Sequence, residues 1–341
     1  MTPLGLSQLG LLFLASALGC LLFGRQVIRQ LVTWQWIQPV RHEDCPPLLP
    51  IQQTKHGTPT MGGLLVLGVA VVSAIGFGGL SAPEGWIVLG ALVSVGALGM
   101  VDDLLKFRRP NAKGIRATPK LVAALGVGGV IGWLLADPAF GYRQVAIPWL
   151  VHRVDLGIWW IPFVCLVMAG CAHAVNLTDG MDGLAVGCLA VAFGAIGLLT
   201  LMPGIAPVTA SLASTQRLVA IWCVSLAGAC VGFLWFNSFP ASVFLGDVGA
   251  LGLGAALGVL ALLSRTAVGL VILGGVFVVE AASVMLQVAS YRWRNKRRIF
   301  RVAPLHHHFQ VGGMSEQKLV VRFWVVGLLL AALGLTALGH S

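Results

Sequence analysis

The chain has 341 residues, of which 57% are hydrophobic and only 10% are charged. An ordinary soluble domain carries about 25% charged residues, and a mean hydropathy of +0.90 leaves more apolar surface than a soluble core can bury. The composition therefore excludes a soluble single-domain enzyme, a disordered chain and a fibrous repeat. It indicates a polytopic membrane protein.

The net charge of +10 comes from 22 lysines and arginines against 12 acids. The cations gather in the gaps between apolar runs, as in the cytoplasmic loops of membrane proteins. Because the chain has no recognised nucleic-acid motif, we expect no nucleic-acid partner. The seven cysteines include no C-x-x-C pair, and we interpret them as small buried hydrophobes.

Ten apolar runs are long enough, or nearly long enough, to cross a bilayer. The first run lacks the positive flank of a cleaved signal peptide and is interpreted as a helix. The sequence therefore predicts an all-α integral membrane protein with ten transmembrane helices in one domain, residues 1–341. The expected helices are Leu4–Ile28, Met61–Leu80, Trp86–Val101, Leu121–Leu135, Leu156–Val175, Leu184–Met202, Leu218–Phe236, Val243–Leu263, Ala267–Val288 and Leu319–Leu338.

Ten crossings would place both termini on one side of the membrane. The loops after the odd-numbered helices, with their flanks, carry 18 of the 22 lysines and arginines. Because cytoplasmic loops are enriched in these residues, we expect the odd loops to be cytoplasmic and both termini to lie outside.

Five of the 12 acids fall at the cytoplasmic ends of expected helices, where a carboxylate is costly and usually functional. Asp102 and Asp103 follow the third helix, and Lys106 lies within helical reach of both. They form either a helix end with a local ion pair or a functional group, which would be a base or a metal-facing acid. Asp247 lies in an otherwise apolar run, where it is either a structural acid or the ligand of a divalent cation.

Asn176, Asp179 and Asp182 lie between the fifth and sixth helices. Their spacing of three places them on one side of a helical turn, and Gly180 permits close approach of a ligand to the backbone. A cap for the sixth helix is the alternative, although three polar side chains exceed what one cap requires.

Residues 55–63, with the sequence KHGTPTMGG, lead into the second helix. The spacing of a P-loop is absent. Backbone N–H groups at this helix start, together with Lys55, are nevertheless suited to binding an anion. The alternative is an ordinary turn.

Three consecutive histidines, His306, His307 and His308, lie in the last expected cytoplasmic loop. They cannot all face one zinc ion from a helix or a strand, and they suit hydrogen bonding to a phosphate better. The basic stretch at residues 292–298 precedes them. Attraction to anionic lipid headgroups explains it at least as well as contact with substrate.

Glu280, Ser283 and Gln287 share one face of the ninth expected helix. A buried polar seam between helices is the simplest interpretation, and a lipid groove or a partner contact is the alternative. Taken together, the motifs describe one cytoplasmic site with carboxylates, lysines and histidines. Such a site suits Mg²⁺-assisted chemistry on a pyrophosphate at a membrane surface.

In order, and over nearly the whole chain, these motifs resemble those of the phospho-N-acetylmuramoyl-pentapeptide transferases, in the polyprenyl-phosphate sugar-1-phosphate transferase superfamily. The triple histidine favours these enzymes over relatives that use N-acetylhexosamines. The matching segments are residues 55–63, 102–103, 176–183, 237, 240, 244–247 and 304–309.

The resemblance implies ten transmembrane helices, a homodimer, Mg²⁺, and a multi-pass protein of the bacterial cytoplasmic (inner) membrane in contact with membrane lipid. It also implies transfer of phospho-MurNAc-pentapeptide from UDP-MurNAc-pentapeptide to undecaprenyl phosphate, which gives lipid I and UMP. Asp247 matches the Mg²⁺ ligand, Asp102 the proposed base and Asp103 its essential neighbour. Phe244 matches the residue that stacks on uracil. The other positions expected to bind substrate are Lys55, Thr60, Lys106, Lys113, Lys120, Asn176, Asp179, Gly180, Asp182, Asn237, Gln287, His306, His307 and His308.

Some positions depart from the family pattern. Met181 and Leu245 stand where Leu and Met are expected, which are volume-conserving exchanges. Gln310 replaces a usual acid after the histidines, and Ile51-Gln52 replaces a usual Ser-His. These departures affect local loop contacts and leave the expected reaction unchanged.

Two alternatives to this function are a related enzyme with another substrate and a protein that is not an enzyme. A relative that transfers GlcNAc-1-phosphate from UDP-GlcNAc to a polyprenyl phosphate is disfavoured by the triple histidine. A membrane transporter would place its acids near the bilayer midplane, whereas the five acids here fall at one face.

Overall fold

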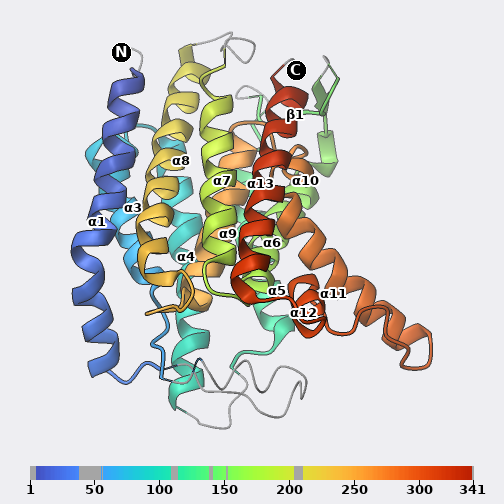
Figure 1. The fold of residues 1–341 in the computed structure, drawn as a ribbon. Coiled ribbons are helices and arrows are strands. Elements are labelled where there is room, and N and C mark those ends of the chain that lie inside the picture. The colour runs from blue at the N-terminus through green and yellow to red at the C-terminus, as the bar shows by residue number, and fades with distance from the viewer. Residues whose placement is uncertain are drawn as a thin grey trace.

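The computed structural model describes residues 5–37, 55, 57–108, 114–137, 141–150, 153–202 and 210–339. This part of the chain is mostly helical, with one short antiparallel hairpin of β1 (Gln144–Ala146) and β2 (Arg153–Asp155) (Figure 1). The α-helices are α1 (Leu6–Thr33), α3 (Gly63–Gly76), α4 (Pro83–Arg108), α5 (Ala117–Leu134), α6 (Trp160–Thr178), α7 (Leu184–Leu199), α8 (Ala210–Asn237), α9 (Gly246–Leu263), α10 (Leu270–Leu273), α11 (Gly275–Trp293), α12 (Leu305–Val311) and α13 (Glu316–Leu338).

Seven of these helices are long and apolar enough to cross a membrane, namely α1, α4, α5, α6, α8, α9 and α13. The helices α3 and α7 are apolar but shorter. Each of the ten runs expected from the sequence overlaps a helix. A mostly helical chain with many apolar helices is therefore confirmed, whereas the count of ten crossings stays a prediction.

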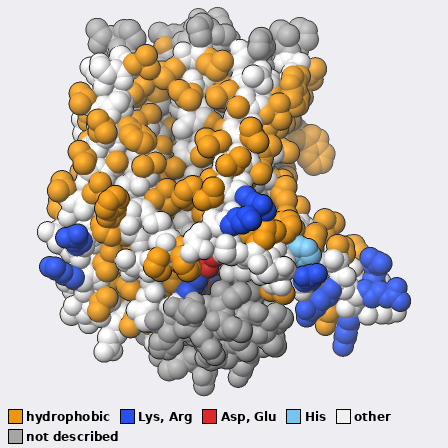
Figure 2. All heavy atoms as spheres, in the orientation of Figure 1, with side chains coloured by type: hydrophobic (Ala, Val, Ile, Leu, Met, Phe, Trp, Pro, Cys, Tyr) orange, Lys and Arg blue, Asp and Glu red, His pale blue; other side chains and the backbone are white. Residues whose placement is uncertain are grey.

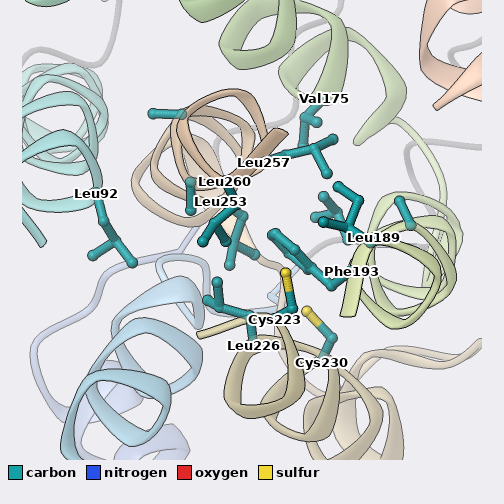
Figure 3. Packing of buried hydrophobic residues seen from close by; sticks show 14 of the residues in the cluster. Leu92, Val175, Leu189, Phe193, Cys223, Leu226, Cys230, Leu253, Leu257 and Leu260 are labelled. Atoms are coloured by element: carbon teal, nitrogen blue, oxygen red, sulfur yellow. The ribbon is translucent and has the colours of Figure 1, made fainter. Parts of the chain in front are cut away.

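The central helix of the bundle is α9. In its most apolar window 89% of the residues are buried, because α9 packs against α3, α4, α6, α7 and α8. Its Leu253, Leu257 and Leu260 lie in the same core cluster as Phe193 of α7 and Leu226 of α8 (Figure 3). In α1 and α5 only 22% of the corresponding window is buried. Their apolar side chains point outward, which favours lipid as the surrounding solvent.

A small residue lets α4 and α9 touch. A Cβ at Gly99 of α4 would overlap the backbone carbonyl of Asp247 in the first turn of α9. Close helix contacts of this kind are typical of membrane bundles. The contact brings the end of α4, with Asp102 and Asp103, beside Asp247.

The structure corrects two expected helix boundaries. The third expected run ends at Val101, but α4 continues to Arg108, so Asp102 and Asp103 lie inside a helix. The ninth run was expected as one helix over Ala267–Val288, and this is wrong. It is divided into α10 and α11 at Gly274, whose φ of −102° and ψ of 21° are not helical. A second glycine follows directly, and glycine is a poor helix former.

Both ends of the described chain lie at the same end of the bundle (Figure 1). Near the opposite end, the C-terminal part of α11 points away from the bundle (Figure 1). The short helix α12 packs between α11 and α13. On the face shown in Figure 2, hydrophobic side chains cover the upper part, and Lys and Arg side chains are confined to the lower part. The site motifs gather toward this lower, charged end.

Candidate active site

Three carboxylates meet where α4 and α9 touch. One carboxylate oxygen from each of Asp102, Asp103 and Asp247 lies within 4.8 Å of the others. Lys120, in the first turns of α5, places Nζ 2.7 Å from Oδ2 of both Asp102 and Asp247. Lys106 Nζ lies 2.7 Å from Asp102 Oδ2 and 3.2 Å from Asp103 Oδ1, as its helical spacing predicted. It also lies 3.1 Å from Asp247 Oδ2.

Backbone groups orient two of these carboxylates. The N–H of Ile115 donates to Asp102 Oδ1 at 2.5 Å, and the N–H of Val248 donates to Asp103 Oδ2 at 3.2 Å. Both acids are buried, whereas the side chain of Asp247 keeps 18% of its surface exposed. Asp247 is therefore the most accessible of the three.

A glycine allows Asp247 to reach the cluster. Gly246 has a φ of +75°, a left-handed conformation that favours glycine. A Cβ at this position would lie 2.8 Å from Thr60 Oγ1 and 2.9 Å from Asp103 Oδ2. Any other residue would therefore press on the carboxylate cluster.

The three carboxylates have the chemistry of a Mg²⁺ site. Carboxylate oxygens are preferred ligands of this hard cation, and the distances between the ligand oxygens allow them to share one ion. The residues therefore fit the expected metal. Asp247 as its principal ligand stays a prediction.

The helix α6 ends between Asn176 and Asp179. Asn176 donates from Nδ2 to Asp247 Oδ1 at 3.1 Å, so it belongs to the carboxylate cluster. Asp182 instead pairs with Lys55. The expectation that Asn176, Asp179 and Asp182 share one side of a helical turn is therefore wrong, because the helix stops before the second of them.

Asp179 lies in the turn after α6, close to the other acids. Burial, together with the negative charges of Asp247 and Asp103, raises the pKa of Asp179 to about 8 against the lowering effect of Lys55. Asp179 therefore binds a proton more readily than an ordinary aspartate.

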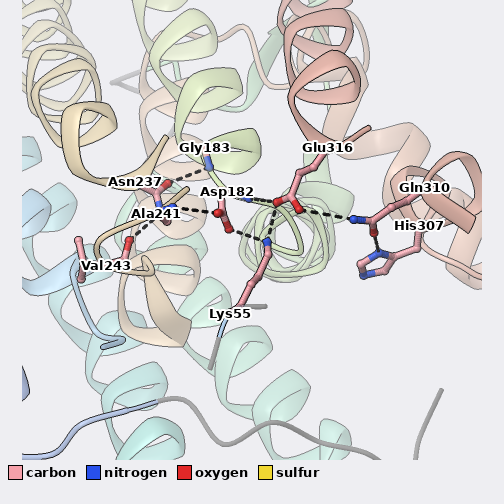
Figure 4. A network of polar contacts seen from close by, with 9 residues as sticks. All are labelled: Lys55, Asp182, Gly183, Asn237, Ala241, Val243, His307, Gln310 and Glu316. Atoms are coloured by element: carbon pink, nitrogen blue, oxygen red, sulfur yellow. Dashed lines mark hydrogen bonds and ion pairs between the residues drawn. The ribbon is translucent and has the colours of Figure 1, made fainter. Parts of the chain in front are cut away.

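A second polar network is built around Lys55 (Figure 4). Lys55 Nζ lies 2.6 Å from both Asp182 Oδ1 and Glu316 Oε1. Glu316 Oε1 also accepts the N–H of Asp182 at 2.8 Å, and Asp182 Oδ2 accepts the N–H of Ala241 at 3.0 Å. The sequence does not predict a role for Glu316. An acid in the first turn of a helix is ordinary, so only its burial distinguishes it.

Asn237 closes this network at the end of α8. Its Oδ1 accepts the N–H of Gly183 at 3.1 Å, and its Nδ2 donates to the carbonyl of Val243 at 2.9 Å (Figure 4). The buried amide therefore holds the start of α7 to the segment that precedes α9. Its expected contact with substrate stays a prediction.

Three of the backbone N–H groups in residues 57–63 that were expected to bind an anion have other partners. The N–H groups of Thr60, Gly62 and Gly63 donate to backbone carbonyls at 2.9, 2.9 and 2.8 Å. These three N–H groups are therefore already paired with distant backbone carbonyls and are not free to bind an anion. The same bonds hold Phe244 next to this segment, with Lys55 Nζ 5.9 Å from the centroid of its ring.

The three histidines lie on α12 and face different partners. His306 Nδ1 lies 3.1 Å from Oε2 of the buried Glu280, and His307 Nδ1 lies 3.0 Å from Oε1 of Gln310. His308 Nδ1 accepts a backbone N–H of the preceding loop at 3.1 Å. As expected, the histidines do not converge on one metal. The partner of His306 was missed, because nothing in the sequence relates Glu280 to a residue 26 positions away.

Helix α12 packs on the turn that follows α6. A Cβ at Gly180 would overlap His306 and would lie 3.1 Å from His307 Nε2. This contact joins two motifs that are far apart in the sequence. It also places His307 beside Gly180, the residue that follows Asp179.

Two further expected positions lie elsewhere. Gln287 accepts the N–H groups of Ile299 and Phe300 at 2.9 and 3.0 Å and donates to the carbonyl of Phe300 at 3.0 Å. Its amide therefore folds the basic loop back on α11. Lys113, together with Ile51 and Gln52, lies outside the described residues.

Known proteins are similar to this chain over most of its length. A model of glycosyl transferase family 4 matches residues 85–265. The phospho-N-acetylmuramoyl-pentapeptide-transferase of Solidesulfovibrio magneticus is 43% identical over 317 residues, which are 91% of this chain and 86% of the relative. The protein of the same name from Pelobacter propionicus is 40% identical over 331 residues, which are 95% of this chain and 91% of the relative. The chain therefore belongs to the phospho-N-acetylmuramoyl-pentapeptide transferases of glycosyl transferase family 4.

Proposed function

We propose that this chain transfers phospho-MurNAc-pentapeptide from UDP-MurNAc-pentapeptide to undecaprenyl phosphate, giving lipid I and UMP. The observation that carries the proposal is the cluster in which Lys106 and Lys120 bridge Asp102 and Asp247. Phosphoryl transfer needs positioning and charge stabilisation more than covalent participation of the protein. This cluster offers both at one end of an apolar bundle.

In the proposed reaction an oxygen of the acceptor phosphate attacks the sugar-side phosphorus of the UDP-sugar. The bond from that phosphorus to the bridging oxygen breaks, and UMP leaves with the electron pair. Lys106 and Lys120 stabilise the charge that gathers on the phosphates. Asp102 orients the acceptor phosphate and takes its remaining proton, with Asp103 fixed beside it.

Asp247, with Asp102 and Asp103, would hold Mg²⁺. When bound, the ion neutralises and orients the pyrophosphate. The exposure of Asp247 supports its assignment as the Mg²⁺ ligand that lies nearest to the incoming substrate.

We assign the nucleotide end of the substrate to the Lys55 side of the site. Phe244 offers an apolar ring face for the uracil, and Lys55 lies near it. The remaining proposed substrate contacts are Thr60, Lys113, Asn176, Asp179, Gly180, Asp182, Asn237, Gln287, His306, His307 and His308.

The membrane arrangement is part of the proposal. Ten crossings would place the active site on the cytoplasmic side of the bacterial inner membrane and the termini in the periplasm. The charge distribution in Figure 2 supports this orientation. At the tip of α11, Trp293 is 84% exposed beside the basic residues 292–298, which suits contact with anionic lipid headgroups. A homodimer is expected from the family resemblance.

Thin-layer chromatography of a radiolabelled prenyl product tests the function directly. Purified protein with undecaprenyl phosphate and UDP-MurNAc-pentapeptide should form lipid I and UMP, and removal of Mg²⁺ should stop the reaction. UDP-GlcNAc in place of the muramoyl nucleotide should give no product. Equal use of both nucleotides, or UMP release without a lipid product, would contradict the proposal.

A further inference from the structure

The hydrogen bonds around Glu316 have a defined direction (Figure 4). Its Oε1 accepts from Lys55 and from the N–H of Asp182, and its Oε2 lies 3.5 Å from Nε2 of Gln310. An ionised carboxylate can only accept hydrogen bonds. The amide nitrogen of Gln310 must therefore face Glu316, because the reverse orientation would set two acceptors against each other.

The orientation of this amide determines the tautomer of His307. Gln310 Oε1 lies 3.0 Å from His307 Nδ1, and an amide oxygen only accepts. The proton of the ring is therefore on Nδ1. Burial lowers the pKa of His307 to about 3, with His306 and Lys55 contributing, so the ring is neutral at pH 7 and Nε2 carries a lone pair.

The unprotonated nitrogen of His307, Nε2, lies beside Gly180, one of the expected substrate-binding positions. Nε2 would lie 3.1 Å from a Cβ at Gly180, which is next to Asp179 in the turn after α6. In the part of the chain that the structure describes, Nε2 has no hydrogen-bond partner, and the side chain is only half-buried. An acceptor is therefore presented to whatever binds at this turn.

We propose that His307 accepts, through Nε2, a hydrogen bond from a hydroxyl or N–H group of the nucleotide-sugar, with Gln310 as the positioning residue that sets this direction. The oxygens of an ionised pyrophosphate carry no hydrogen, so His307 is not a phosphate ligand. This corrects the phosphate-binding interpretation of the histidines for this residue. The identity of the ligand rests on the proposed function, whereas the direction of the hydrogen bond rests on this chain alone.

The neighbouring histidine provides a comparison within the same helix. His306 faces the carboxylate of Glu280 where His307 faces an amide. A carboxylate favours a protonated ring, and an amide does not. The substitution Gln310→Glu would therefore give His307 the same kind of partner that His306 has.

Nitrogen NMR of the full-length protein labelled with ¹⁵N-histidine tests the direction without any substrate. The signals of His307 are those lost in His307→Gln. We expect a protonated, pyrrole-type Nδ1 and an unprotonated, pyridine-type Nε2 at neutral pH. In Gln310→Glu both nitrogens should become protonated at a higher pH than in wild type. A protonated Nε2 in the wild-type protein would overturn the proposal.

Two matched variants test the contact with the nucleotide-sugar. His307→Gln keeps an acceptor near the position of Nε2, whereas His307→Lys offers donors only. An unmatched buried polar group costs about 1–3 kcal/mol, so Lys should lower kcat/KM for the nucleotide-sugar about 10- to 100-fold more than Gln does. A Lys variant as active as the Gln variant would overturn the proposal, because an ammonium serves a phosphate well.

The two measurements separate the possible failures. If both variants lose all activity, the NMR result decides the direction of the hydrogen bond. If wild-type protein forms no lipid I, the proposed function fails, and the NMR spectra still test whether Nε2 is an acceptor.

Discussion

Lys120 of α5 holds its ammonium 2.7 Å from Oδ2 of Asp247 in α9, across 127 residues of sequence. A cation is therefore already placed against the carboxylate that we assign to Mg²⁺. Opposite charges this close attract strongly in a partly buried site. Mg²⁺ and Lys120 would compete for Asp247 until a pyrophosphate arrives, because its additional negative charge can satisfy both cations.

Asp247→Asn should abolish transfer while the fold is retained. The amide keeps the size of the side chain but removes the charge that binds a hard cation. Product formation over a Mg²⁺ titration measures the effect. Asp155→Asn is the control, since Asp155 is an exposed acid on β2 whose side chain keeps 54% of its surface accessible. Near-normal turnover of Asp247→Asn at limiting Mg²⁺ would show that another residue is the ligand.

Phe244→Ala should raise KM for the nucleotide-sugar more than it lowers kcat. The ring lies beside Lys55, and stacking of a base on an aromatic ring contributes about 1–3 kcal/mol. The expected rise in KM is therefore about 10- to 100-fold. Phe23→Ala, at an exposed position on α1, should leave KM unchanged. An unchanged KM in Phe244→Ala would place the uracil elsewhere.

Glu316→Gln should weaken both stability and turnover. Glu316 Oε1 accepts from Lys55 and from the N–H of Asp182, and hydrogen bonds to charged groups contribute about 1.5–3 kcal/mol. Thermal unfolding and initial rates measure the two effects. Gln317→Ala, at the exposed neighbouring position, is the control. A wild-type unfolding temperature in Glu316→Gln would mean that Lys55 is held by Asp182 alone.

The local part of this site could be predicted from the sequence. Lys106 pairs with Asp102 and Asp103 because residues three and four apart meet on any helix. The five acids are expected at one end of the bundle because apolar runs show where helices end. Both predictions depend only on the period of a helix and the thickness of a membrane.

The long-range part could not be predicted in the same way. Lys55 and Glu316 are 261 residues apart. His306 of α12 contacts Glu280 of α11, and a loop separates these two helices in the sequence. Such contacts depend on how the helices pack, and a single sequence does not show that packing. The same limit explains the error at residues 176–182. There α6 ends at Thr178, and the long-range contacts of Asn176 with Asp247 and of Asp182 with Lys55 replace the expected helical spacing.

Asp179→Asn should stabilise the protein at alkaline pH. The pKa of Asp179 is about 8 in the folded protein, above its ordinary value of 3.8. Between these values the folded state binds a proton that the unfolded chain has released, so wild-type stability falls as pH rises from about 4 to about 8. Asn resembles the protonated acid and does not titrate. The variant's Tm minus the wild-type Tm should therefore grow across this window.

Thermal unfolding in detergent without Mg²⁺ or nucleotide measures this difference. Asp155→Asn, at an exposed acid on β2, is the control. A flat profile for Asp179→Asn would mean that Asp179 is ionised in the folded protein at neutral pH.

Asp102→Asn should be slow below pH 7 and should partly recover as pH rises. The acceptor is a phosphate monoester with a second pKa of about 6, so at pH 7 most of it is already a dianion and needs little activation. General-base help is worth roughly 10²–10⁴-fold. If Asp102 acts only as a base and a positioning residue, a higher pH deprotonates the acceptor phosphate and so replaces the base. Initial rates from acid to alkaline pH measure the recovery, with Asp155→Asn as the unchanged control.

A two-step path predicts a different result for the same variant. If Asp102 were the nucleophile, its carboxylate oxygen would bond to the sugar-side phosphorus and UMP would leave before the lipid arrives. Asp102→Asn would then be inactive at every pH. Wild-type protein without prenyl phosphate would also exchange labelled UMP into the UDP-sugar. Such exchange, in protein from which the bound lipid carrier has been removed, would refute direct attack.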